Sequence, residues 1–108
     1  MEERRIAPRI RAAFKVMLSV PGKFWRKSNV DARSVDISTY GIGLALGSPI
    51  DDLRQIGMRI YGPSLEGAIE ASGMVMWQSK GPNHSYRAGI KFTEIAWSKI
   101  RDLIRSIS

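Results

Sequence analysis

The sequence predicts an all-β domain, a six-stranded antiparallel β-barrel with one C-terminal α-helix. Several segments alternate apolar and polar residues with a period of two, as half-buried strands do. Clusters of glycine, proline, serine and asparagine separate these segments, and near the C-terminus the apolar period lengthens to three or four residues. Six antiparallel strands in a chain of 108 residues are expected to close into a barrel, because closure leaves no strand edge unpaired.

The strands expected in the first half of the chain lie at residues 12–20, 30–37 and 41–46. Each places alternate apolar side chains on one face, namely Phe14, Val16 and Leu18, then Val35 and Ile37, then Ile42, Leu44 and Leu46. Ser48 and Pro49 open a segment that is expected to form a single helical turn or a loop. The carboxylates that follow, Asp51 and Asp52, fit a helix N-terminus better than an acid–base pair.

The strands expected in the second half lie at residues 58–61, 68–77 and 86–92. The turn of residues 80–83 joins the last two of them. Residues 96–107 are expected to form an amphipathic helix that covers an end or an edge of the barrel. The apolar pattern places Trp77 and Trp97 in the core, whereas Trp25, in a basic loop, is expected to be exposed.

The composition excludes several classes of protein. The formal charge is +7, from 17 Lys and Arg against 10 Asp and Glu, which favours anionic partners. There is no cysteine for disulfides or thiolate chemistry, and a single histidine cannot supply a transition-metal cluster. No apolar run approaches the roughly 18 residues that a membrane span needs, and the N-terminus is charged where a signal peptide is apolar. We therefore expect a cytoplasmic protein with no membrane span, no metal and no cofactor.

Basic residues are concentrated at the N-terminus. The first eleven positions contain Arg4, Arg5, Arg9 and Arg11. We therefore divide the chain into a flexible basic tail, residues 1–11, and a barrel domain with its helix, residues 12–108. Pro8 keeps the tail from forming a regular helix.

No catalytic arrangement stands out, so an enzyme is not predicted. Asp36, Ser38 and His84 supply the residue types of a hydrolytic triad, but a nucleophile elbow of the GxSxG type is absent. Gly41 and Gly43 lead from one expected strand into another, whereas a phosphate-binding loop needs its glycines between a strand and a helix.

Two short motifs remain to be explained. The tail contains RIAPR, from Arg5 to Arg9, and the second expected strand is followed by DISTYG, from Asp36 to Gly41. Either motif alone is a weak signal. Together, in this order and with the 26 residues from 10 to 35 between them for a strand, a loop and a strand, they are specific.

With these motifs the chain resembles the PilZ domain family, the bacterial receptor modules for cyclic di-GMP. The resemblance continues through GLAL, VMW, YRAGIKF and the terminal helix, so it covers essentially the whole chain, and it implies a six-stranded barrel with a flanking helix. Arg5 and Arg9 match the arginines that hold the guanines and phosphates of the ligand. Asp36 and Ser38 match turn residues that bond a guanine edge or other polar ligand atoms, and Gly41 closes this turn.

The residue types suit this ligand. A guanidinium can bond guanine O6 and N7 together, pair with a phosphate or stack on the base, and the Asp36 carboxylate can accept from guanine N1 and N2. Gly41 can adopt a positive φ without a side chain in the way, which leaves the turn backbone open to the ligand. Arg4, directly before the motif, resembles an arginine that accompanies binding of two stacked ligand molecules rather than one.

The leading hypothesis is therefore a non-enzymatic cyclic di-GMP receptor. Its tail is expected to become ordered over the ligand and to relay the signal to a partner protein or a fused output domain, with no specific nucleic acid bound. One alternative is a basic barrel that binds single-stranded nucleic acid through Phe24 and Trp25 beside Arg26 and Lys27. Another is a PilZ-like adaptor that binds only protein partners.

Overall fold

The computed structural model describes residues 9–21, 27–50, 55–62 and 67–107. Within these ranges it contains seven strands and one helix: β1 (Ile10–Arg11), β2 (Lys15–Pro21), β3 (Lys27–Ile37), β4 (Gly41–Leu46), β5 (Gln55–Tyr61), β6 (Ile69–Lys80), β7 (Tyr86–Ile95) and α1 (Trp97–Ile107). The predicted helical turn at Asp51 and Asp52 lies outside the described residues, as does Trp25. β5 begins three residues before the strand predicted at 58–61, because Ile56 continues its inward alternation.

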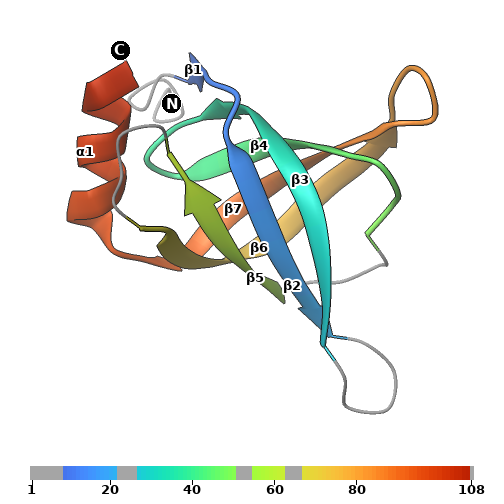
Figure 1. Cartoon of the computed structure of the whole chain (residues 1–108), viewed down its shortest axis with the longest axis horizontal. Coiled ribbons are helices and arrows are strands. Elements are labelled where there is room, and N and C mark those ends of the chain that lie inside the picture. Colours follow the sequence, from blue (N-terminus) through green and yellow to red (C-terminus); the bar gives the residue numbers. More distant parts are fainter. Residues whose placement is uncertain (1–8, 22–26, 51–54, 63–66, 108) are drawn as a thin grey trace, which may run out of the picture.

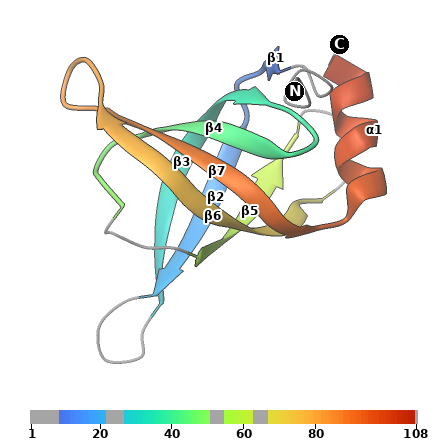
Figure 2. The same cartoon turned by 180° about the vertical axis from the view of Figure 1, so that it is seen from behind.

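The six long strands close into an antiparallel barrel, as the sequence predicts (Figure 1). Their order around the barrel is β3-β2-β5-β6-β7-β4, and the pairing of β4 with β3 closes the ring. The two-residue strand β1 extends the sheet at the end of β3, where Ile10 lies opposite Ile37 and Arg11 opposite Asp36. Figure 2 shows α1 beside the turn between β3 and β4 and near β1.

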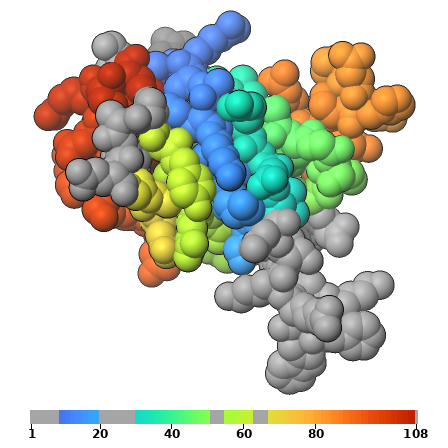
Figure 3. All heavy atoms as spheres, in the orientation of Figure 1, coloured from blue at the N-terminus to red at the C-terminus, as the bar shows by residue number. Residues whose placement is uncertain are grey.

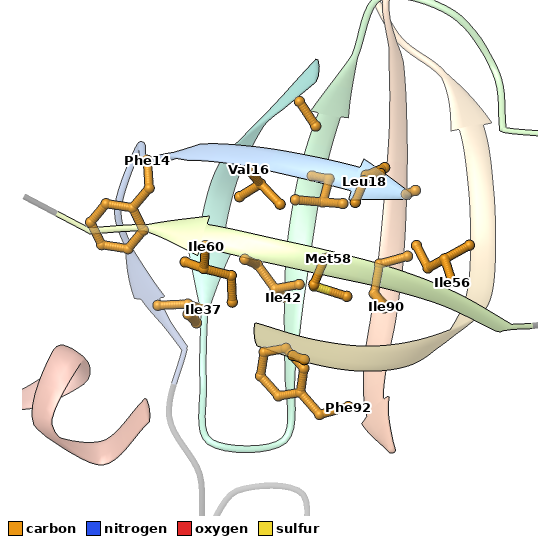
Figure 4. Packing of buried hydrophobic residues seen from close by; sticks show 14 of the residues in the cluster. Phe14, Val16, Leu18, Ile37, Ile42, Ile56, Met58, Ile60, Ile90 and Phe92 are labelled. Atoms are coloured by element: carbon orange, nitrogen blue, oxygen red, sulfur yellow. The ribbon is translucent and has the colours of Figure 1, made fainter. Parts of the chain in front are cut away.

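Alternate side chains of the strands fill the interior of the barrel. Figure 4 shows Val16 and Leu18 of β2, Met58 of β5 and Ile90 of β7 pointing into this common core, and all four are buried. The helix adds Ile100 and Leu103 to the same cluster. In the space-filling view, side chains of β2, β3 and β5 cover the front face of the barrel continuously, and α1 lies along one side (Figure 3).

A β-bulge in β3 changes which residues face the core. The register with β4 shifts between Ser34, opposite Leu44, and Asp36, opposite Gly43. Val35, expected to share the core face with Ile37, is therefore only partly buried, and Ser34 takes the inward position before the bulge. A bulge adds one residue to a strand and so reverses the alternation beyond it. The consequence is that Ile37 enters the core while Asp36 faces outward.

The buried hydroxyl of Ser34 is fully used. Its Oγ accepts a hydrogen bond from the backbone N–H of Phe14 at 2.7 Å and donates to the carbonyl of Ala12. These bonds satisfy backbone groups in the gap between β1 and β2, where no ladder partner is available. The short strand β1, and with it the start of the described chain, is thus tied to β3 immediately before the bulge.

The prediction that Trp77 and Trp97 are core residues is wrong. Trp77 is 53% exposed and Trp97 is 44% exposed. A second irregularity explains Trp77, because the register between β6 and β7 shifts between Val75 and Trp77 and turns the indole outward. Trp97 is the first residue of α1, before the helical face formed by Ile100 and Leu103 reaches the core.

Candidate functional site

The two motifs meet in the structure at an ion pair. The Nη1 of Arg9 lies 2.7 Å from the Oδ1 of Asp36, although the residues are 27 positions apart in the chain. The pairing of β1 with β3 carries Arg9 to this place, and the β3 bulge directs the carboxylate outward to meet it. The side chains are 51% and 31% exposed, so a ligand can reach both.

Ser38 organises the turn that follows. Its Oγ accepts hydrogen bonds from the backbone N–H groups of Tyr40, at 3.1 Å, and Gly41, at 3.3 Å. The backbone N–H of Ser38 donates to the carbonyl of Gly41 at 2.9 Å. This is the pattern by which a serine side chain fixes a tight turn. Ser38 is buried, so the structure assigns it to the turn, and its contact with a ligand stays a prediction.

Gly41 does not use the positive φ that a glycine can adopt, since none of the glycines in the described ranges has a positive φ. Gly41 is needed for a different reason, because a Cβ at this position would overlap the backbone carbonyl oxygen of Ile90. The glycine lets β4 approach β7 closely at the start of the strand. Its role in the described structure is therefore close backbone packing.

Gly43 is a site residue that the sequence analysis missed. A Cβ on Gly43 would lie 2.7 Å from the Oδ1 of Asp36, closer than two such atoms can approach. Gly43 lies opposite Asp36 across the β3–β4 pair, so the missing side chain is what leaves room for the carboxylate. The spacing of Gly43 after the DxSxxG motif is the only signal in the sequence, and it has meaning only once the register is known.

Across a hollow from the turn lies the exposed ring of Trp77 on β6, which we call the aromatic wall. The indole of Trp77 covers Gly89, where any Cβ would overlap its Nε1. Trp77 and Lys91 line a hollow of about 170 Å³ together with Arg9 and Tyr40. The sequence holds two signals for this wall: a glycine inside an expected strand, and the apolar run Met74 to Trp77 that interrupts the alternation.

The family of the chain can be decided at this point. A model of the PilZ domain matches residues 3–108, nearly the entire sequence. The chain belongs to the PilZ domain family. Among curated proteins, none matches this PilZ chain.

Solved structures share its fold at low sequence identity. The inhibitor of motility MotI/DgrA from Bacillus subtilis superposes with a TM-score of 0.73 at 21% identity, over 94% of this chain and 48% of that one. The PilZ domain of YcgR from Escherichia coli, solved with c-di-GMP, gives 0.65 at 19% identity over 96% and 88%. YcgR from the same organism in complex with c-di-GMP gives 0.65 at 22% identity over 96% and 44%. The PilZ chain thus spans about half the length of MotI/DgrA and of that longer YcgR chain.

Some of the predicted features of this PilZ domain lie outside the residues that the structure describes. Arg4 and Arg5 fall outside the described residues, so only Arg9 of the RxxxR motif is placed. The basic aromatic loop at Phe24 and Trp25 is outside them as well. Among the residues that are described, no group of three or more His, Cys, Asp or Glu could hold a metal ion. The helix in the described ranges is too short to cross a membrane.

Proposed function

We propose that this PilZ domain is a receptor for cyclic di-GMP and carries out no catalysis. The observation that supports it most is the 2.7 Å contact between Arg9 and Asp36, because one accessible ion pair joins the two sequence motifs. Both YcgR structures that resemble this chain contain c-di-GMP, and their fold covers 96% of it. The chemistry of the pair is compatible with the same ligand.

Arg9 and Asp36 present complementary groups to a guanine base. The guanidinium donates to O6 and N7 of guanine or to a phosphate, and the carboxylate accepts from N1 and N2. In the structure the two groups satisfy each other. A guanine that enters between them offers each a new partner, so neither charge is left uncompensated when the direct ion pair opens.

The aromatic wall provides a surface for the flat face of a base. Trp77 is more than half exposed, and its indole is held against Gly89. Stacking on such a ring is favourable for any base, whereas the polar pair selects guanine. Lys91, at the edge of the same hollow, supplies a cation for a phosphate.

Arg4 and Arg5 complete the proposed site on the strength of the motif. We propose that their segment closes over the bound ligand, and that Arg5 shares the phosphates and guanines with Arg9. Occupancy would then be relayed to a partner protein or a neighbouring domain. The chains of MotI/DgrA and of the longer YcgR structure are about twice as long as the region matched, which is compatible with an output outside the PilZ domain.

Isothermal titration with cyclic di-GMP tests the proposal. The wild-type chain is expected to bind, and Arg9→Ala and Asp36→Ala are each expected to weaken affinity about tenfold or more, because each removes a charge-assisted contact. Arg59→Ala is the matched control. It removes an exposed ion pair between Arg59 Nε and Glu70 Oε2 at 3.4 Å, on β5 and β6, and should leave the affinity unchanged.

Two outcomes would reject this function. One is the absence of both binding heat and a shift in melting temperature at about tens of micromolar ligand, where an affinity useful to a receptor would be visible. The other is equal competition by mixed single-stranded oligonucleotides with a steep loss of binding in salt, which would identify a nucleic-acid-binding barrel instead.

A further inference from the structure

A second hollow lies between the β3–β4 turn and α1. Thr39, Tyr40, Trp97 and Arg101 line it, and its volume of about 410 Å³ is in the range of small-molecule sites. Figure 2 shows the turn next to the helix, with β6 and β7 passing below the turn in this view. Tyr40 lines this hollow and also the smaller one beside Trp77, so the two hollows share a side chain.

The helix presents an aromatic ring and a cation to this second hollow. Trp97 and Arg101 are four positions apart on α1, which places them on the same face one turn apart. Within the described part of the chain, the guanidinium of Arg101 has neither a carboxylate nor a hydrogen-bond partner. Trp97 and Tyr40 are 44% and 55% exposed, an unusual degree of exposure for two neighbouring large aromatic side chains.

The two hollows therefore repeat one chemistry on either side of Tyr40. One combines Trp77 with Arg9 and Lys91, and the other combines Trp97 with Arg101. A ring paired with a guanidinium or an ammonium suits a base joined to a phosphate, since the ring stacks on the base and the cation meets the anion. Cyclic di-GMP contains two such units.

We propose that the hollow at the helix is a second subsite, which takes a guanine base on Trp97 and its phosphate on Arg101. This inference rests on the proposed function, because it assigns the other half of the same ligand. The ligand then contacts both the turn and α1. The ligand would thus bridge the turn and α1, in addition to the contact that Ile100 and Leu103 of the helix make with the core.

Titration of two helix variants with cyclic di-GMP tests the subsite. Arg101→Gln and Trp97→Leu are each expected to weaken binding about tenfold, comparable with the loss of one stacked base or one charged contact. Arg105→Gln is the control, since Arg105 is exposed on the same helix and does not line the hollow. The stoichiometry tests the occupant: one ligand per chain agrees with its second guanine in the subsite, whereas two ligands per chain would overturn that assignment in favour of a second molecule.

Tryptophan fluorescence gives a second readout, which does not rely on measuring a loss of affinity. Three tryptophans are present, so replacing Trp25 and Trp77 by Phe leaves Trp97 as the single tryptophan, and Phe keeps at position 77 a ring on which a base can stack. Ligand is expected to quench this emission by stacking. Unchanged emission, together with wild-type affinity of Arg101→Gln and Trp97→Leu, would overturn the subsite. If Arg9→Ala and Asp36→Ala still lose binding in that case, the receptor function stands, whereas no binding by the wild-type chain removes both.

Discussion

The two walls of the candidate site are held in place by different kinds of interaction. The wall formed by β3 and β4, the polar wall, is fixed by polar contacts: Ser38 bonds the turn backbone, and Arg9, directly before β1, reaches Asp36. The aromatic wall, formed by β6 and β7, consists of one exposed indole, that of Trp77, which lies on Gly89. Each polar contact is directional and requires specific atoms, whereas the indole requires only a flat surface with no Cβ.

Because of this difference, the two walls are expected to contribute differently to ligand recognition. In the proposed receptor, directional groups such as the Asp36 carboxylate would distinguish guanine from other bases, because only the correct donors satisfy them. In the same proposal, a stacked ring such as Trp77 would add affinity for any base. Changes to the polar wall should therefore affect both affinity and selectivity, and changes to the aromatic wall should affect affinity alone.

The largest effect is expected from Gly43→Ala. The new Cβ would stand 2.7 Å from the Oδ1 of Asp36 and would push the carboxylate away from Arg9. Because the obstructed atom is the end of a side chain, the barrel itself need not deform, so stability should change little. Affinity for cyclic di-GMP, measured by titration, should fall about tenfold or more, as when a charged contact is lost. The ratio of the affinities for cyclic di-GMP and cyclic di-AMP should become smaller.

Gly47→Ala is the matched control for this experiment. Gly47 lies just beyond the same strand, and a Cβ there meets nothing within 4 Å. Its affinity should equal that of the wild-type chain. Wild-type affinity in Gly43→Ala as well would mean that the position of Asp36 is unimportant for binding, and the division of roles between the walls would be wrong.

The polar wall was largely predictable from the sequence, and the aromatic wall was not. The turn of DISTYG depends on contacts within a few residues, so its composition alone indicates its place and its polar character. The resemblance to the PilZ family, which rests on the order and spacing of the two motifs, assigns Arg9 to the same site, whereas its ion pair with Asp36 comes from the structure. The need for Gly43, in contrast, follows from the register across two strands, and no local pattern encodes that register.

The error at Trp77 has the same physical origin. In an ideal strand, Ile69, Ala71 and Trp77 would lie on one face, and the first two are buried as predicted. The register shift between Val75 and Trp77 adds one residue to β6 and reverses the alternation before it reaches Trp77, whereas the shift after Ser72 adds its extra residue to β7 and leaves the alternation of β6 intact. Such bulges arise from the fit between paired strands, so the segment read by itself predicts the wrong face. The prediction of a barrel is still correct, because closure of the barrel depends on the six strand pairings and not on any single side chain.

An intermediate effect is expected from Gly89→Ala. A Cβ at this position would overlap the ring of Trp77 and force the indole off the strand, while Trp77 itself stays in the chain. The free energy of binding should become less favourable by about 1 kcal/mol, near the lower limit of the contribution of one stacked base. Titration with cyclic di-GMP and with cyclic di-AMP should show the same loss for both ligands.

Gly57→Ala on β5 is the control, because a Cβ there meets only ordinary contacts at 3.8 Å or more. A change of base selectivity in Gly89→Ala would contradict the assignment of the aromatic wall to affinity alone. Trp77→Ala should reproduce the loss seen in Gly89→Ala, and the double variant should add little to either, since both changes remove the same surface.

The smallest effect on binding is expected from Ser38→Ala, and it separates the turn from the ligand. Removal of the Oγ leaves the N–H groups of Tyr40 and Gly41 without their acceptor, so the free energy of unfolding should fall by about 1 kcal/mol. Denaturant titration measures this loss, and Ser79→Ala, at an exposed position of β6, is the control that should stay within about 0.5 kcal/mol of the wild-type chain. Affinity should fall by no more than about threefold if the buried hydroxyl mainly shapes the turn, equal to about 0.7 kcal/mol. A loss as large as that of Asp36→Ala would instead make Ser38 a direct ligand contact, and the polar wall would then recognise its ligand with both halves of the DxS sequence.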